Sequence, residues 1–142
     1  MELQRIDLTI PENQEALYNF YQRNYEAPDY LLPTTFEGIY YTVTDGEHLL
    51  AVTKHHYPSP FLLKTSSTVV HKDMRGQGIG RFLNEEVEKM AKENGVLKLA
   101  CHVYVDNLPS LILKLKRGYI IEGTLYNHDE PGKHEYILGK EL

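Results

Sequence analysis

Hydrophobic residues recur along the chain with two different spacings. In residues 97–105, apolar Leu99, Cys101 and Val103 alternate with more polar neighbours, which is the two-residue repeat of a strand with one buried face. In residues 79–93, apolar positions recur every three or four residues, which is the repeat of an amphipathic helix. We therefore expect a helix followed closely by a strand in this part of the chain.

The remaining elements follow from the same spacings, with proline and glycine marking the breaks. Pro11 suits the first turn of a helix, and Asp45-Gly46 is typical of a tight hairpin turn because glycine adopts positive φ easily. In chain order we expect strand 1–8, helix 11–27, an irregular or short helical segment 27–38, two hairpin strands within 39–56, strand 61–71, helix 108–118, and strands 119–127 and 134–142.

The order of these elements predicts a mixed sheet. Strand 61–71, helix 79–93 and strand 97–105 form a βαβ unit, whose two strands should be parallel with a right-handed crossover. The hairpins make the other neighbours antiparallel. The segment YPSP at 57–60 is expected to separate the first hairpin from the next strand. No linker or repeat is visible, so we expect residues 1–142 to form one domain.

The composition argues against several functions. The net charge is −5 and no basic stripe is present, so nucleic acid is not expected as a partner. The N-terminus lacks the apolar core of a signal peptide and no apolar run could cross a bilayer, so we expect a cytoplasmic protein without membrane contact. Cys101, the single cysteine, is expected in the core, and no CxxC or HxxxH spacing indicates a metal site.

A glycine-rich segment lies at the start of the predicted helix 79–93. Gly76, Gly78 and Gly80 stand at alternate positions after Arg75. The first N–H groups of a helix have no intrahelical partner and lie at the positive end of its dipole, and glycines let an anion approach closely. The segment therefore predicts an anion site, most often for phosphate, with the arginine as an added donor at its rim. It matches neither the P-loop nor the Rossmann spacing.

Two segments resemble signatures of the GNAT superfamily of acetyl-CoA-dependent N-acetyltransferases. TVVHKDMRGQGIGRFLNEEVEK at 68–89 is similar to the family's acetyl-CoA-binding motif, and VYVDNLPSLILKLKRGYIIEG at 103–123 is similar to its later strand, asparagine and helix. The resemblance implies a GNAT-like α/β fold. That fold has a mixed, mostly antiparallel central sheet, helices on both faces, and a parallel core, here strand 61–71, helix 79–93 and strand 97–105.

The resemblance also implies which residues bind acetyl-CoA as cosubstrate. In the family, the backbone of the fourth strand contacts the pantetheine arm, the glycine loop holds the pyrophosphate, and an asparagine beside the fifth strand contacts the cofactor. The matching positions in this chain are Thr68, Val69, Val70, Arg75, Gly76, Gln77, Gly78, Ile79, Gly80, Arg81 and Asn107.

The activity implied is acetyl transfer to a primary amine of a small molecule or peptide, by direct attack in a ternary complex. The family often has a tyrosine as general acid four residues before its Gly-aromatic pair, and here Lys114 occupies that position. Lys114 could donate a proton if burial lowered its pKa, although a solvated helix lysine is the simpler interpretation. Tyr104 and Tyr119 are alternatives, but Tyr119 fills the usual core-aromatic position.

The general base is not marked by a motif. His102 on strand 97–105 and His71 after strand 61–71 both titrate near neutral pH in ordinary surroundings. Water relayed to a carboxylate such as Glu122 is an equal alternative. Positioning and backbone donors to the developing oxyanion could also carry much of the catalysis.

Other functions stay open at this point. The absent tyrosine favours, as an alternative, a non-catalytic module that binds or senses acyl-CoA, and a phosphate- or nucleotide-binding protein of another fold requires a sheet that is not mixed. Acidic residues near 25–30 and 126–134 weakly favour a cationic amine, and a homodimer is a further option. The charged residues of helix 79–93 are expected on its solvated face: Glu85, Glu86, Glu88, Lys89, Lys92 and Glu93.

Overall fold

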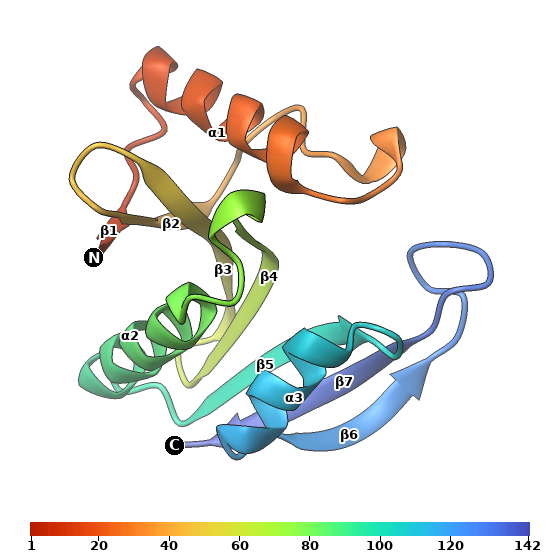
Figure 1. The fold of residues 1–142 in the computed structure, drawn as a ribbon. Helices are drawn as coiled ribbons and strands as arrows, with labels where there is room; N and C mark the ends of the chain where they lie inside the picture. Colours follow the sequence, from red (N-terminus) through yellow and green to blue (C-terminus); the bar gives the residue numbers. More distant parts are fainter. The chain divides into compact units, whose positions relative to one another are not determined.

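A computed structural model describes the whole chain, Met1–Leu142. Figure 1 shows its elements. In chain order they are β1 (Glu2–Arg5), α1 (Pro11–Asn24), the 3-10 helix η1 (Asp29–Leu31), β2 (Ile39–Thr44), β3 (Leu49–Ser59), β4 (Leu62–Val70), the 3-10 helix η2 (Lys72–Met74), α2 (Ile79–Glu93), β5 (Lys98–Tyr104), α3 (Leu108–Lys116), β6 (Ile120–Leu125) and β7 (Glu135–Glu141). The predicted order of elements is confirmed, and η2 was not predicted.

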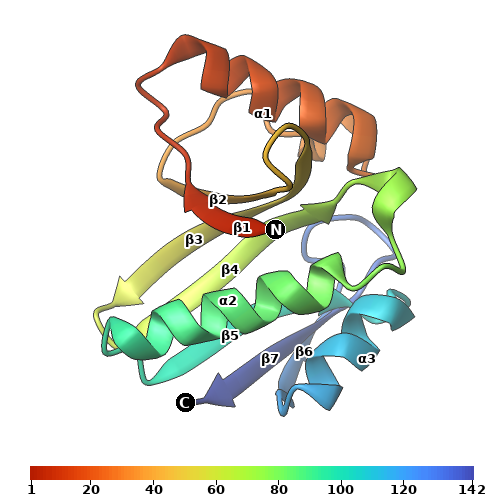
Figure 2. The ribbon, with the colours of Figure 1, turned by 60° about the vertical axis from the view of Figure 1, so that its left-hand side comes forward.

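The strands form one seven-stranded sheet in the order β1-β2-β3-β4-β5-β7-β6. β4 and β5 pair in parallel, while β1 with β2, β2 with β3, β5 with β7 and β6 with β7 are antiparallel. The helix α2 connects the two parallel strands (Figure 2). The predicted βαβ unit and the mixed, mostly antiparallel sheet are therefore confirmed.

The chain divides into two compact units, and each is described by itself. One contains residues 1–56 and 67–87, and the other contains residues 57–66 and 88–142. The single domain expected over residues 1–142 stays a prediction. None of the helices has the length and apolar character that a membrane-spanning helix needs.

In the first unit, α1 covers one face of β2, β3 and β4, and the first half of α2 lies on the other face (Figures 1 and 2). Helix α1 presents its apolar side to the sheet, and the aromatic rings of this core pack edge-to-face or stacked. Burying each such side chain stabilises the fold by about 1.5–3 kcal/mol. The core cluster consists of Leu17, Phe20, Tyr21, Phe36, Tyr40, Val52 and Val69.

Two element boundaries differ from the sequence prediction. Helix α1 ends at Asn24 because Tyr25 is extended, at φ −92° and ψ 108°, although its N–H still bonds to the carbonyl of Tyr21. The YPSP separator is wrong, since β3 continues to Ser59. Pro58 is tolerated in that strand because β2 pairs with β3 only as far as His55, so no ladder bond to β2 is lost there.

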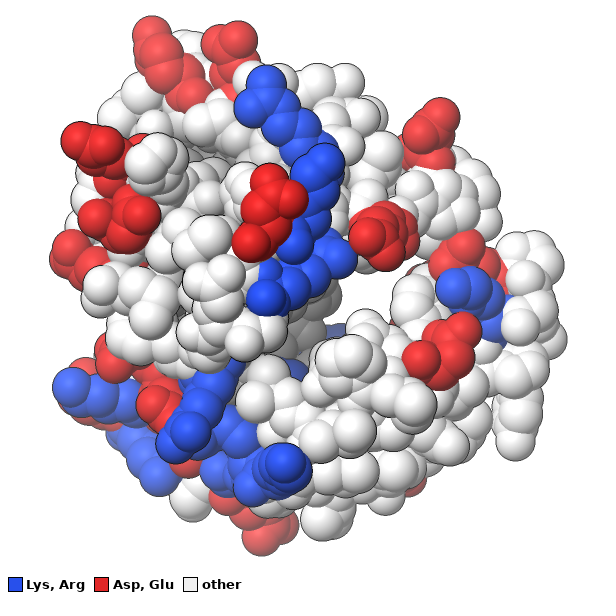
Figure 3. Space-filling model, viewed as in Figure 1, with Lys and Arg blue, Asp and Glu red and all other residues white.

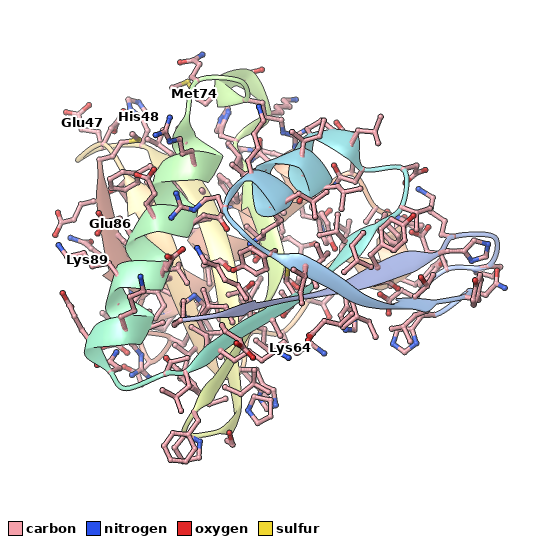
Figure 4. The ribbon with its side chains drawn as sticks, turned by 90° about the horizontal axis from the view of Figure 1, so that it is seen from below. Glu47, His48, Lys64, Met74, Glu86 and Lys89 are labelled. Carbon is pink, nitrogen blue, oxygen red and sulfur yellow. The ribbon has the colours of Figure 1, made fainter.

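The solvated face predicted for α2 is wrong at one position. Glu86 and Lys89 point outward from the helix (Figure 4), but Glu88 is only 8% exposed. Arg117 donates to its Oε2 at 3.0 Å, and the Nζ of Lys140 donates to both carboxylate oxygens at 3.0 and 2.9 Å. Burial raises the pKa of Glu88, but these hydrogen bonds outweigh burial and hold that pKa below its ordinary value. Glu88 is therefore a buried ion-pair centre.

Candidate active site

The glycine loop before α2 has an exposed backbone. Gly76 and Gly78 adopt positive φ, +75° and +84°, a conformation that only glycine takes without strain. A Cβ built on either glycine would meet no atom within 4 Å, so the space beside both is open. The N–H groups from Gly78 to Arg81 donate to no protein acceptor, since the first such bond in the helix is from Phe82 to the Gly78 carbonyl at 3.0 Å. The loop can therefore hold an anion through its backbone.

Arg75 connects this loop to the end of α1 through hydrogen bonds. Its guanidinium donates to the carbonyl of Asn24 at 2.7 Å, to the carbonyl of Val70 at 3.2 Å and to the carboxylate of Glu26 at 3.2 Å. Met74, which ends η2, lies beside the N-terminal end of α2 in Figure 4. Most of the guanidinium is committed to protein acceptors, so the structure gives Arg75 a positioning role. The cofactor contact suggested for it stays a prediction.

Strand β4 bends just before the residues expected to contact a pantetheine arm. Ser67 has φ +47°, which is unusual for a residue other than glycine, and its carbonyl accepts a hydrogen bond of 2.5 Å from the buried hydroxyl of Tyr21. The next residue, Thr68, bonds through its hydroxyl to that of Thr53 at 2.7 Å. The side chain of Val69 is buried in the α1 core. The backbone after the bend is thus held on both faces of the strand.

The parallel ladder between β4 and β5 is short. It pairs Leu62–Lys64 with Lys98–Ala100 and extends no further. Residues 101–104 of β5 remain paired with β7 on the other side. Beyond the ladder, residues 101–104 of β5 pair with β7 alone. A strand edge of this kind can take up an extended ligand through main-chain hydrogen bonds.

The three catalytic candidates do not share one face of β5. Side chains alternate along a strand, so His102 and Tyr104 point to one face while Cys101 points to the other. Cys101 is buried, as predicted, and raises the pKa of Lys114 electrostatically. The structure therefore brings the histidine and the tyrosine to one face, while the lysine interacts with the cysteine that points to the other face.

The ammonium group of Lys114 lies against an aromatic ring. Its Nζ is 4.8 Å from the ring centre of Tyr119, a cation–π arrangement, and Tyr119 is buried. Burial lowers the pKa of Lys114, an effect that nearby Arg117 reinforces and that Cys101 and Glu88 oppose. The solvated lysine considered above does not describe this side chain. A lysine with a lowered pKa can donate a proton near neutral pH.

The face with His102 and Tyr104 continues into the β6–β7 loop. The Tyr104 hydroxyl donates to Glu130 Oε2 at 2.8 Å, and the Nζ of Lys133 lies 5.1 Å from the Tyr104 ring centre. The ring of His128 lies 6.1 Å from that of His102. Figure 3 shows acidic and basic side chains together at this loop. The acidic character expected for residues 126–134 is therefore partly balanced by lysine.

Asn107 is the N-cap of α3. Its side-chain oxygen accepts a hydrogen bond from the N–H of Ser110 at 3.4 Å, which satisfies one of the free donors of the helix. Asn107 is exposed, so its side-chain amide nitrogen is accessible to solvent. The cofactor contact expected for Asn107 stays a prediction.

Sequence reasoning missed Glu135. This residue is 4% exposed at the start of β7 and stands opposite Tyr104 in the β5–β7 ladder. Its Oε1 is 3.7 Å from Nδ1 of His102, and its Oε2 has no hydrogen-bond partner. Nothing in the local sequence HEYILGKEL indicates this, because the contact depends on the register between two strands far apart in the chain.

The chain is similar in sequence to known acetyltransferases. The sequence model of the acetyltransferase (GNAT) family matches residues 1–119. A Bacillus subtilis (strain 168) protein named "Putative phosphinothricin acetyltransferase YwnH" is 32% identical over 91 residues, which cover 61% of this chain and 56% of that protein. The match thus spans little more than half of that relative.

Solved structures share the fold. The ribosomal-protein-S18-alanine N-acetyltransferase of Escherichia coli superposes with a TM-score of 0.82 and 17% identity, over 99% of this chain and 93% of that one. An aminoglycoside 6′-N-acetyltransferase complexed with coenzyme A superposes with a TM-score of 0.76 and 16% identity, over 99% and 97%. At these identities the likeness is one of fold, and the acceptors differ from protein to protein.

Proposed function

Since this chain belongs to the acetyltransferase (GNAT) family, we propose that it transfers an acetyl group from acetyl-CoA to a primary amine of a small molecule or peptide. The observation that carries the proposal is the free backbone at the start of α2. Four consecutive N–H groups, Gly78 to Arg81, donate to no protein acceptor and follow two glycines with open space beside them.

The residues present fit acetyl-CoA. The free amides and the helix dipole suit its pyrophosphate, and Gly76 and Gly78 leave room for phosphate oxygens where any side chain would intrude. Residues 68–70, at the end of β4, would offer backbone groups to the amides of the pantetheine arm. Asn107, the N-cap of α3, is exposed. Acetyl-CoA supplies an activated acetyl group as a thioester.

Side chains of this protein would accept and donate the protons of the reaction. An ammonium acceptor first loses one proton to His102 and from there to solvent. Its nitrogen then bonds to the thioester carbonyl carbon, the C–S bond breaks with its electron pair on sulfur, and the second proton lost by nitrogen ends on that thiolate. Lys114 is the proposed donor of this proton or of charge stabilisation, since burial lowers its pKa.

The proposal is tested by calorimetric titration of acetyl-CoA and by thiol release with a panel of amines. We expect binding in the micromolar range, roughly −8 kcal/mol, and thiol release that requires both acetyl-CoA and an amine. Mass spectrometry should show one acetyl group on nitrogen. Absence of binding at millimolar acetyl-CoA would overturn the proposal.

A non-catalytic acyl-CoA-binding module is the second candidate. It is favoured by one observation, that Lys114 stands where the family often has a tyrosine as general acid. Tight binding of acetyl-CoA without acetyl transfer to any amine in a broad panel would select this alternative over the enzyme.

A further inference from the structure

His102 and Glu135 form a contact that the register of two antiparallel strands creates. Tyr104 pairs with Glu135, and His102 pairs with Ile137, so the histidine and the glutamate are diagonal neighbours on one face of β5 and β7. The Nδ1 of His102 is 3.7 Å from Oε1 of Glu135. The distance is slightly too long for a hydrogen bond, a small rotation of either side chain closes it, and the contact becomes ionic only when the imidazole is protonated.

Glu135 is buried without a full set of partners. The residue is 4% exposed, and its Oε2 has no hydrogen-bond partner, an arrangement that costs stability. Burial, and after it the neighbouring Asp129, raise the pKa of Glu135 to about 7, while His128 opposes the shift. The carboxylate therefore gains its charge within the pH range in which an acetyl transfer would be assayed.

His102 is surrounded so that it stays neutral in that range. Burial lowers its pKa first, Lys64 on β4 and His128 lower it further, and Asp129 opposes them. Its side chain is 23% exposed, so solvent and a ligand can reach the ring. A neutral imidazole with one nitrogen held by a carboxylate leaves the other nitrogen as the proton acceptor.

Tyr104 does not compete for this role. Burial and the hydrogen bond to Glu130 raise its pKa, so its hydroxyl keeps its proton and stays bonded to that carboxylate. The side chains around the histidine also do not form a group of three or more that could hold a metal ion. The carboxylate of Glu135 is the acceptor that lies near Nδ1 of His102, at 3.7 Å.

We infer that Glu135 is a positioning residue for His102: its carboxylate holds the imidazole with the proton on Nδ1, so that Nε2 accepts the proton of the ammonium acceptor. This inference rests on the proposed function and deepens it by naming the base and its partner. In the step, the N–H bond of the ammonium breaks, its electron pair stays on nitrogen, and a proton is bound at Nε2. The imidazolium so formed is stabilised by the adjacent Glu135 carboxylate and later releases the proton to solvent.

Nitrogen NMR of the histidine rings tests the contact without requiring turnover. With uniformly ¹⁵N-labelled protein, we expect His102 to carry its proton on Nδ1 above pH 7, and its ring signals to report a titration near pH 7. In Glu135→Gln the carboxylate charge is gone, so that titration should vanish and the two tautomers should mix. Glu141→Gln, which changes an exposed carboxylate at the last residue of the same strand β7, serves as the control and should leave His102 unchanged.

Kinetics on the same proteins test the role. Glu135→Gln should lower kcat/KM for the amine at least tenfold at pH 8 and abolish its rise through pH 7, with unchanged affinity for acetyl-CoA, since a positioned base contributes about 10²–10⁴ in rate. The nitrogen NMR of the wild-type protein needs no variant. If it shows the His102 proton on Nε2, the inference is overturned and the proposed function still stands. Full activity of Glu135→Gln does the same. A wild-type protein that binds acetyl-CoA but acetylates no amine overturns both.

Discussion

The hydroxyl of Tyr21 on α1 donates a hydrogen bond of 2.5 Å to the carbonyl of Ser67, at the bend in β4. The two residues are 46 positions apart in the chain. Burial raises the pKa of the tyrosine, so the donor proton is always present. This bond gives a side-chain donor to the carbonyl at the residue with positive φ, and it couples the first helix to the strand expected to contact the pantetheine arm.

Tyr21→Phe should therefore affect both stability and binding. The ring still fills the core, but the Ser67 carbonyl loses its partner, which costs about 1–3 kcal/mol in the free energy of unfolding. Chemical denaturation measures this cost, and calorimetry should show weaker binding of acetyl-CoA. Tyr18→Phe, a change on the exposed side of the same helix, is the matched control. Equal stability of the two variants would show that the bond does not support the bend.

Comparing Gly78→Ala with Gly95→Ala should distinguish a loss of acetyl-CoA binding from a loss of stability caused by backbone strain. Gly78 and Gly95 both have positive φ, +84° and +78°, and a Cβ on either meets no atom within 4 Å. Each alanine variant should therefore lose a similar ~1–2 kcal/mol of stability from strain. Only Gly78→Ala should weaken acetyl-CoA binding, by tenfold or more, because its methyl group enters the space beside the free amides. The same affinity in both variants would argue against the loop as the anion site.

Glu88→Gln should destabilise the fold in a pH-dependent way. The change leaves Arg117 and Lys140 without their buried partner, at a cost of roughly 3 kcal/mol. Because the pKa of Glu88 is lower in the folded state than in the unfolded state, its contribution is complete above the unfolded value of about 4.3 and is lost as the pH falls below it. Unfolding curves of wild type and variant should therefore differ at pH 7 and converge at acid pH.

The outward-pointing Glu86 on the same helix provides the comparison. Glu86→Gln should change the free energy of unfolding by less than about 0.5 kcal/mol at either pH. A cost for Glu86→Gln as large as that for Glu88→Gln would mean that general charge balance, and not the buried ion pairs, sets the stability.

Lys114→Met tests the proton donor. The methionine fills similar space beside Tyr119 but cannot donate, so kcat should fall about tenfold or more while the affinity for acetyl-CoA is kept. Because burial lowers the pKa of Lys114, wild-type activity should decline at alkaline pH earlier than for an ordinary lysine. Lys114→Tyr should retain activity. Lys116→Met, at an exposed position, should behave as wild type, and full activity of Lys114→Met would remove Lys114 from the mechanism.

Features that depend on neighbouring residues in the chain were predictable from the sequence, and features that depend on contacts between distant elements were not. Helix α2 begins and ends where its glycines and apolar repeat place it, 79–93, because those signals lie within the helix itself. The same reasoning failed at Glu88, whose partners Arg117 and Lys140 come from other elements. Glu135 was missed for the same reason, since only the β5–β7 register brings it to His102.

The central claim, that the backbone at the start of α2 binds the pyrophosphate of acetyl-CoA, is tested most directly by amide NMR. On titration with acetyl-CoA, the amide signals of residues 76–81 and 68–70 should shift in a saturable way, while those of Asp45, Gly46 and Gly95 should not. Saturable shifts confined to other parts of the chain, with residues 76–81 unmoved, would contradict the account.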